Sequence, residues 1–481
     1  MERNVGLTLT VPRLSRRDCL ISVAALSLAG LAPTRHARAV DRMRLVAEAG
    51  EAPLVANEGP ATPVWSYNGQ VPGPVLRARQ GERLRVEVEN RLDEPTTVHW
   101  HGLRIPVEMD GVPWVSQPPI APGETFVYEF DLTDAGTFWY HPHINSAQQV
   151  GRGLHGALIV EERNPPEVDR EILWVMDDWR LDRSAQVMPF GGMMDLSHAG
   201  RLGNTVTVNG SIAMAEALRS GERVRLRLIN VANARTFAVQ LPEMPVWLVA
   251  LDGHPVPPHP LAGNRVVLGV GMRADLILDM TGAPGDRVPV IDDAYGRERA
   301  YELMTFVYED RPALKKATRP APAALEPNPV TLPEPDGAER HRVVFEGGAM
   351  GRMHGAMMGG RFMSMRDLAG AGRLWAMNGV VPENVFEAEP LLTLSLGRSH
   401  IIELVNQTAF DHPIHLHGHS FRILRQGGQP VPHQPLRDTV LLAPQQTAEI
   451  ALFADNPGMW MFHCHILEHQ GSGMMAKVKV A

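Results

Sequence analysis

The C-terminal segment GMWMFHCHILEHQGSGMM gathers side chains that bind transition metals. Two histidines, one cysteine thiolate and one weakly bound methionine are typical of a blue-copper electron-transfer site. Cys464, His469 and Met474 supply three of these four ligands, which leaves His463 and His465 unexplained. Successive side chains of a strand point to opposite faces. We therefore expect His463 and His465 to face away from Cys464 and to bind other metal ions.

Three further groups of paired histidines lie elsewhere in the chain. HWHG, HPH and HPIHLHG contain His99, His101, His141, His143, His412, His415 and His417. With the C-terminal segment, these groups hold ten of the 20 histidines. A lone histidine is usually a hydrogen-bonded or exposed imidazole. Four His-x-His pairs at strand spacing, one of them around a cysteine, instead predict several bound metal ions.

The composition favours an all-β protein. The 481 residues include 44 glycines and 40 prolines, and the leucine- and valine-rich runs are short, which is typical of many strands joined by turns. A formal charge of −8 and the lack of a basic stripe argue against a nucleic-acid partner.

The N-terminal residues 1–39 resemble an export signal of the twin-arginine type. Arg16 and Arg17 precede the apolar run LISVAALSLAGLA, and an Ala-x-Ala site ends at Ala39. We therefore expect cleavage after Ala39 and a periplasmic protein, with an ordinary secretory signal as the alternative. The apolar run is too short to span a bilayer, so we expect no stable membrane anchor.

Removal of this signal leaves one cysteine in the mature chain. Cys19 lies within the signal, so only Cys464 remains and no internal disulfide can form. A lone thiol in an oxidising compartment is liable to oxidation, and a metal ion that holds the sulfur as thiolate protects it. The cysteine count therefore agrees with metal binding at Cys464.

The chain contains a threefold internal repeat. An Asn-Gly pair is followed each time by a strand-like segment that ends in asparagine, at 81–90 (GERLRVEVEN), 221–230 (GERVRLRLIN) and 397–406 (GRSHIIELVN). A second strand-like segment recurs at 121–130, 270–280 and 443–453. Repeats of this length are duplicated domains.

Alignment of the copies places the metal-binding residues in the outer two. His99 follows Asn90 by nine residues and His415 follows Asn406 by nine, whereas Val239 stands at this distance in the middle copy. We therefore expect ligands from the first and third domains and none from the middle one. The expected domains are 42–163, 164–310 and 341–481, with a proline-rich linker at 311–340.

The four histidine groups, their order and the His-Cys-His tail resemble those of three-domain multicopper oxidases, over essentially the whole mature chain. The resemblance implies three consecutive cupredoxin-like Greek-key β-barrels and four copper ions. It implies that type 1 copper binds to His412, Cys464, His469 and axial Met474, and type 2 copper to His99 and His415. One type 3 copper would bind to His101, His141 and His465, and the other to His143, His417 and His463.

The same resemblance implies a reaction. A reducing substrate gives single electrons to the type 1 copper. Each electron passes through Cys464 to His463 and His465, which we therefore expect to be catalytic. Four coppers store the four electrons that reduce dioxygen to two waters.

The residues expected to supply protons match the family only in part. Asp110 matches an acidic residue that family members use beside the trinuclear copper cluster, so we expect it to be catalytic. A second acid commonly follows the last type 1 histidine, but Gln470 stands there in this chain. Glu468 and Asp455 are the acids nearest to it in sequence.

A methionine-rich stretch at 347–365 points to the substrate. It contains Met350, Met353, Met357, Met358, Met363 and Met365. Glycines are frequent and branched aliphatic residues rare, so we do not expect a packed core there. Thioethers favour Cu(I), and the stretch is similar in character to the insert of bacterial copper-efflux oxidases, which oxidise Cu(I). MPFGGMM at 188–194 is a smaller group of the same kind.

Two alternative functions remain open. One is a laccase-like oxidase of phenols or aromatic amines, favoured because Thr408 stands where some copper-efflux oxidases have a carboxylate. The other is a copper-sequestering resistance protein with incidental oxidase activity. A copper-free member of the fold is excluded by the filled ligand positions, and a two-domain nitrite reductase is disfavoured by the third repeat. The expected partners are dioxygen and Cu(I) or a small organic reductant, and we expect a monomer.

Overall fold

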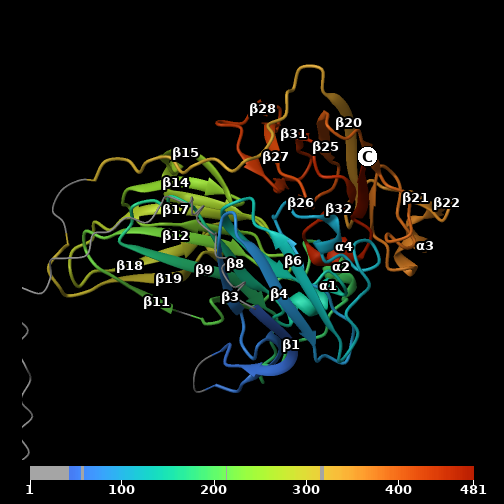
Figure 1. The fold of residues 1–481 in the computed structure, drawn as a ribbon. Coiled ribbons are helices and arrows are strands. Elements are labelled where there is room, and N and C mark those ends of the chain that lie inside the picture. The colour runs from blue at the N-terminus through green and yellow to red at the C-terminus, as the bar shows by residue number, and fades with distance from the viewer. Residues whose placement is uncertain (1–42, 56–58, 213, 315–318) are drawn as a thin grey trace, which may run out of the picture. The chain divides into compact units, whose positions relative to one another are not determined.

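The computed structural model describes residues 43–481 except 56–58, 213 and 315–318. The expected signal at 1–39 lies outside these residues. The described chain is built mainly of strands, with a few short helices (Figure 1). The predicted all-β class is confirmed. None of the described helices is long and apolar enough to cross a membrane.

The first third of the chain forms two four-stranded sheets, ordered β2-β1-β4-β6 and β3-β8-β7-β5. The strands are β1 (Met43–Ala52), β2 (Thr62–Tyr67), β3 (Gly73–Arg79), β4 (Arg83–Asn90), β5 (His99–His101), β6 (Thr125–Asp131), β7 (Gly136–His141) and β8 (Gly156–Glu161). The helices are the 3-10 turn η1 (Val107–Met109) and α1 (Ser146–Gly151). Inward side chains of both sheets share one apolar core around Trp100.

The middle third also forms two sheets, ordered β10-β9-β12-β17-β14-β15 and β11-β19-β18-β13-β16. The strands are β9 (Arg170–Trp179), β10 (Thr205–Val208), β11 (Met214–Leu218), β12 (Arg223–Asn230), β13 (Phe237–Gln240), β14 (Val246–Leu251), β15 (His254–Pro260), β16 (Arg265–Leu268), β17 (Arg273–Asp279), β18 (Arg287–Asp292) and β19 (Tyr301–Tyr308). The helices are α2 (Met193–Ser197), η2 (Ala262–Asn264) and η3 (Arg297–Arg299).

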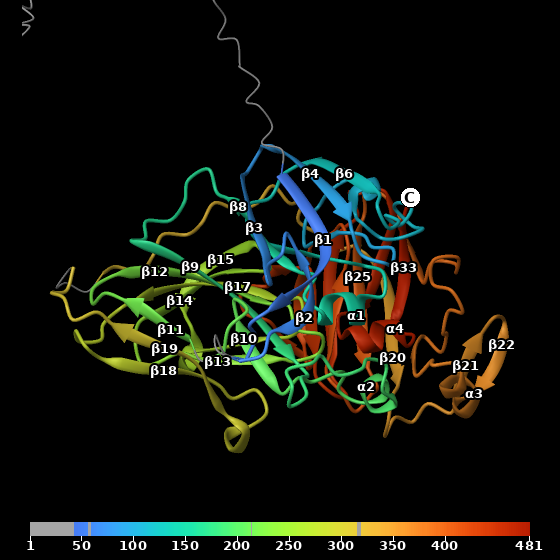
Figure 2. The ribbon, with the colours of Figure 1, turned by 90° about the horizontal axis from the view of Figure 1, so that it is seen from below.

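The last third has two large sheets, ordered β23-β20-β25-β31-β27-β28, with β29 paired to β27, and β24-β33-β32-β26-β30. The strands are β20 (Glu339–Gly347), β23 (Trp375–Met377), β24 (Leu392–Leu394), β25 (Ser399–Asn406), β26 (His412–Leu416), β27 (Phe421–Gln426), β28 (Gln429–Pro430), β29 (Leu436–Arg437), β30 (Thr439–Leu442), β31 (Thr447–Phe453), β32 (Gly458–Cys464) and β33 (Met475–Val480). Helix α4 (Leu467–Gly471) follows β32 and contacts α1 and α2 (Figure 2).

The repeat found in the sequence corresponds to one repeated strand arrangement. Its first segments form β4, β12 and β25, and its second segments form β6, β17 and β31. In each copy the first strand pairs antiparallel with the second and parallel with an earlier strand, β1, β9 or β20. Three two-sheet units in a row agree with the predicted series of barrels.

The repeated asparagine at the strand end holds the following loop. In the first copy the Asn90 amide donates to the carbonyl oxygens of Glu94 and Ile120, while its own oxygen accepts from the backbone N–H of Leu92. Asn230 and Asn406 make the same kinds of bond in the other copies. In the outer copies, this loop leads to the first histidine of a pair.

The methionine-rich stretch is folded, which corrects the expectation that it lacks a packed core. It forms the hairpin of β21 (Gly355–Met358) and β22 (Arg361–Ser364), followed by α3 (Met365–Gly370). This unit projects from the last third of the chain in both views (Figure 1, Figure 2). Four of its methionines pack against Ala356, Leu368, Ala376 and Val381. Met350 and Met357 stay exposed.

Candidate metal centres

Eight of the predicted histidines meet where the first and third domains touch. β5 pairs with β7, which places His99 opposite His141, and β26 pairs with β32, which places His415 opposite His463. Potential ligand atoms lie within 4.8 Å of one another in the triads His99/His101/His415, His101/His141/His465 and His143/His417/His463. All eight side chains are buried. The residues that the sequence assigned to a trinuclear cluster therefore converge.

The two domains contribute to this cluster symmetrically. The ring of His99 stacks on that of His417 with centroids 3.8 Å apart, and the ring of His101 stacks on that of His415 at the same distance. Each His-x-His pair of one domain thus lies against a pair of the other. Neither domain alone supplies all three histidines of any of these triads.

Two aspartates fix which ring nitrogens face the cluster. The Asp110 carbonyl accepts from Nδ1 of His99 at 2.8 Å, and its carboxylate accepts from Nδ1 of His417 at 2.8 Å. Asp438 makes the same two kinds of contact from the third domain. Its carbonyl accepts from Nδ1 of His415 at 2.9 Å, and its carboxylate accepts from Nε2 of His101 at 3.0 Å. A donated N–H leaves the opposite ring nitrogen with a free lone pair.

The free nitrogens behave as those of metal ligands. Among the described residues, Nε2 of His99, His141 and His415 is buried without a hydrogen-bond partner. Buried polar atoms rarely stay unpaired. Burial lowers the pKa of nearly all the clustered imidazoles, so they are neutral at pH 7. Neutral imidazoles with unpaired nitrogens fit copper or another borderline metal.

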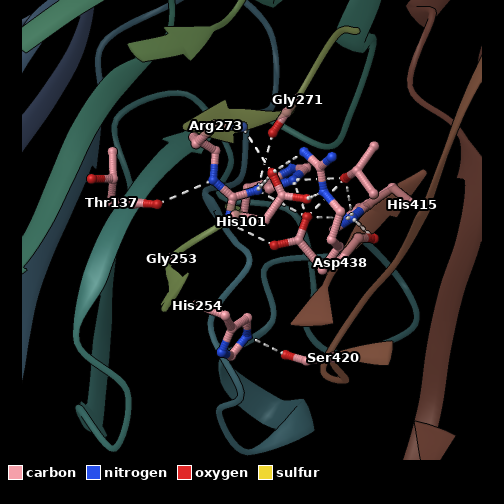
Figure 3. A network of polar contacts seen from close by, with 12 residues as sticks. His101, Thr137, Gly253, His254, Gly271, Arg273, His415, Ser420 and Asp438 are labelled. Carbon is pink, nitrogen blue, oxygen red and sulfur yellow. Dashed lines mark hydrogen bonds and ion pairs between the residues drawn. The ribbon is translucent and has the colours of Figure 1, made fainter. Parts of the chain in front are cut away.

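The middle domain anchors this cluster through Arg273. The Arg273 guanidinium binds both carboxylate oxygens of Asp438, at 2.8 and 2.6 Å, and donates to the carbonyl oxygen of Thr137 at 3.1 Å (Figure 3). Although burial acts to raise it, Arg273 and His101 hold the pKa of Asp438 well below its usual value. The fixed carboxylate then orients His101. One arginine therefore joins all three domains.

A second cluster forms at the other face of β32. Cys464 Sγ lies 3.5 Å from Nδ1 of His412 and 3.7 Å from Nδ1 of His469, and the two Nδ1 atoms are 3.2 Å apart. Burial raises the pKa of the thiol, and a bound metal ion offsets this by stabilising the thiolate. Met474 is buried in the same core as Cys464. Its role as an axial ligand stays a prediction.

The second cluster is covered rather than open. His412 and His469 are 0% exposed. The Trp375 ring lies over His469, with centroids 4.2 Å apart. Nε2 of His469 donates to the His198 carbonyl oxygen at 2.6 Å, just beyond α2. The middle domain thus contacts both clusters. The sequence did not predict these contacts, because this domain has no paired histidines.

Polar neighbours complete the site. Thr408, noted as the replacement for a carboxylate, hydrogen-bonds with its hydroxyl to Nε2 of His412 at 2.7 Å. Gln470 lies against the trinuclear cluster, with its amide nitrogen 3.3 Å from Nε2 of His143. Glu468 instead accepts from Asn233 and from the backbone of Arg201.

The proton sources remain predictions. Asp455 lies near Arg104 at 3.9 Å and its side chain is partly exposed. Within the described chain, the polar partners found for Glu468 and Asp455 are thus not cluster histidines. Asp110 touches the cluster as expected, and its role in proton transfer stays a prediction.

Sequence reasoning missed Asp438 and Arg273. Asp438 was detectable in principle, because an acid lies between the His-x-His pair and the following repeated strand in both outer domains. Arg273 gave no such signal, since it opens β17, where Thr125 and Thr447 open the equivalent strands. Its function depends on a contact 165 residues away in sequence.

The comparisons with known proteins agree with this site. Three family models described as multicopper oxidase match residues 49–165, 171–303 and 364–481. The chain is 30% identical to multicopper oxidase MmcO of Mycobacterium tuberculosis over 456 residues, covering 87% of this chain and 84% of that protein. It is 26% identical to a copper resistance protein A homolog of Pseudomonas syringae, covering 88% and 90%.

A solved structure shares the whole architecture. The multi-copper oxidase from Pseudomonas thermotolerans is 39% identical, with a TM-score of 0.80, and the match covers 92% of this chain and 99% of that one. The family resemblance, the three-domain cupredoxin-like fold and the copper cofactor are thereby confirmed.

We predict that Cys464→Ser lowers the copper content from four ions per chain to three and abolishes the strong visible absorption. Cys464 belongs to a triad separate from the other three, and a serine hydroxyl does not replace a thiolate as a soft ligand. Copper analysis and absorption spectroscopy of the purified variant test this. Loss of all copper would contradict the separation of the two clusters.

We predict that Arg273→Leu lowers the copper occupancy of the trinuclear cluster and destabilises the protein by about 3–5 kcal/mol, because Asp438 stays buried without its partner. Arg225→Leu is the matched control. Arg225 is equally buried and binds Asp275 and Glu162, away from the clustered histidines. The control should lose similar stability in thermal unfolding yet retain four coppers. Equal copper loss in both variants would refute a specific role of Arg273.

Proposed function

The chain belongs to the multicopper oxidase family, and we propose that it oxidises Cu(I) to Cu(II) while reducing dioxygen to water. The observation that carries this proposal is the place of the methionine-rich hairpin beside the His412/Cys464/His469 cluster. Copper held at the two clusters would supply one-electron redox chemistry and dioxygen binding. The ligand assignment follows the triads described above.

The hairpin and the cluster are joined by β23. Ala376 lies in the apolar core that packs Met353, Met358, Met363 and Met365. The preceding residue, Trp375, has its ring against His469 and His412, with centroids 4.2 and 5.1 Å apart. The hairpin core and the ring that contacts both histidines thus involve neighbouring residues of β23, on its two opposite faces.

The exposed sulfurs suit capture of the ion. Met350 is 77% exposed and Met357 is 40% exposed. Met193 and Met194 of α2 are exposed as well, and α2 is held to this region because the Leu196 carbonyl accepts from the Trp375 indole N–H at 2.7 Å. Soft thioethers in solvent reach favour Cu(I) over Cu(II).

The remaining residues position the reaction. Cys464 lies between His463 and His465 in the chain, so the sulfur of one cluster is covalently continuous with ligands of the other. The oxygen acceptors Asp110 and Asp438 hold their histidines in one tautomer, which keeps the site organised for each turnover. Asp110 is our proposed proton carrier, since its carboxylate is the acid that directly touches His417.

A laccase-like oxidation of phenols or aromatic amines is the second candidate. It is favoured by Thr408, whose hydroxyl binds His412. Some copper-efflux oxidases have at this position a carboxylate that could bind a cationic substrate, and this chain does not. The buried state of His469 argues against it, because a bulky donor cannot touch the imidazole directly. Copper sequestration with incidental oxidase activity is the third candidate. The similarity to copper resistance protein A agrees with either copper function.

We also propose that the reaction takes place in the periplasm. Cu(I) detoxification belongs outside the cytoplasm, and the sequence of residues 1–39 agrees with export through the twin-arginine route to the periplasm. A monomer without a membrane anchor suffices for this chemistry, since both clusters are complete within one chain.

We predict that the double variant Met350→Leu/Met357→Leu lowers kcat/KM for Cu(I) by about tenfold, equivalent to ~1.4 kcal/mol. Leucine keeps size and apolarity but removes the sulfur donors. Oxidation of a bulky phenol should stay unchanged, and Met244→Leu, at a half-buried site of the middle domain, should affect neither. Steady-state rates at buffered low Cu(I) test this. Equal losses for both substrates would favour the laccase-like function.

A further inference from the structure

Close contacts between imidazole nitrogens mark the metal clusters of this protein. In the described part of the chain, five histidine pairs bring ring nitrogens within 3.4 Å of each other in hydrogen-bonding geometry. Four of them lie in the two clusters: His143–His463, His417–His463, His101–His465 and His412–His469. The fifth pair is His341 and His400, with Nε2 and Nδ1 3.1 Å apart. It belongs to neither cluster.

Strand pairing brings a carboxylate to this fifth pair. β20 and β25 run parallel, with Glu339 in register with His400. His341 lies two residues beyond Glu339, so both side chains point to the same face. Oε2 of Glu339 lies 3.6 Å from Nδ1 of His400. Two imidazoles and one carboxylate therefore converge at the start of β20.

The neighbours of the group leave its donor atoms available. Nε2 of His400 donates to the carbonyl oxygen of Ser395 at 3.1 Å, which leaves Nδ1 as a lone-pair donor. Oε2 of Glu339 accepts from the Ser395 hydroxyl at 3.2 Å and retains a second lone pair. Arg398 lies 3.8 Å from the other carboxylate oxygen, Oε1.

The spacing suits a single ion. Nitrogen and oxygen ligands at about 2.0–2.2 Å from zinc in tetrahedral geometry lie roughly 3.3–3.6 Å from each other. Nδ1 of His400 lies 3.1 Å from Nε2 of His341 and 3.6 Å from Oε2 of Glu339. His400 is fully buried, whereas the side chain of Glu339 is 37% exposed and His341 is half-buried. The group is thus anchored at one side and open to solvent at the other.

We propose that Glu339, His341 and His400 form a further metal site, which binds a divalent borderline transition-metal ion such as Zn(II) or Cu(II). Nitrogen and carboxylate donors select such ions, in contrast to the thioethers of the hairpin. A bound ion ties the start of β20 to β25 and so stabilises the point where the third domain begins. This site is independent of the substrate of the oxidase.

Zinc titration of the copper-loaded full-length mature protein tests the site. Zn(II) is added after loosely bound metal is removed, and its binding is measured by calorimetry and by metal analysis after gel filtration. The wild-type protein should bind one equivalent more than His341→Gln or Glu339→Gln. It should also gain unfolding temperature with Zn(II), and the two variants should not.

A stacked histidine pair elsewhere in the chain provides the matched control. His259 and His433 stack with centroids 4.6 Å apart, and Nδ1 of His259 already donates to the Pro257 carbonyl oxygen. His259→Gln should bind as much Zn(II) as the wild-type protein. Four coppers and the visible absorption in every variant report that the fold is intact.

Two results would overturn the proposal. Wild-type protein that binds no Zn(II) beyond its coppers would show that His341 and His400 form only an imidazole–imidazole hydrogen bond. Zinc binding that is the same in His341→Gln, Glu339→Gln and wild type would place the ion elsewhere on the protein.

Discussion

The hydrogen bonds of Asp110 and Asp438 across the interface between the first and third domains are the contacts on which the rest of the structure depends. Asp110 and Asp438 each hold one histidine of their own domain through the backbone and one of the other domain through the carboxylate. Eight buried imidazoles without such acceptors would leave many polar atoms unpaired, which is costly in a dry interior. The two-domain cluster is therefore a polar network that only the docked domains complete.

The middle domain, which contributes no residue to the four triads described above, is part of this network. Arg273 neutralises Asp438, and the His198 carbonyl binds His469. A domain without histidines in these triads can thus still orient those of its neighbours, because orientation of an imidazole needs one charge or one carbonyl oxygen. The repeated strands β4, β12 and β25 keep the domains similar enough to pack in this way.

Local patterns in the sequence predicted the repeated strands, the threefold repeat and the strand spacing of the paired histidines. The alternation around Cys464 placed His463 on the opposite face of β32, and the repeated Asn90, Asn230 and Asn406 marked equivalent loops. Arg273 and Asp438 were missed because their partners are distant in sequence. The methionine-rich stretch was misjudged because its core partners Ala376 and Val381 lie outside it, so a count of apolar residues within the stretch could not find them.

The Arg273 bond has a consequence for biogenesis. The histidines of the clustered triads come from both ends of the chain, and the arginine that binds Asp438 comes from its centre. A nascent chain with only its first two domains folded has no third-domain histidine to complete a triad, and in a complete chain whose third domain is not docked, Asp438 lacks its Arg273 partner. Full metal loading therefore reports that synthesis and docking of the whole polypeptide are finished, and it distinguishes mature molecules from late folding intermediates.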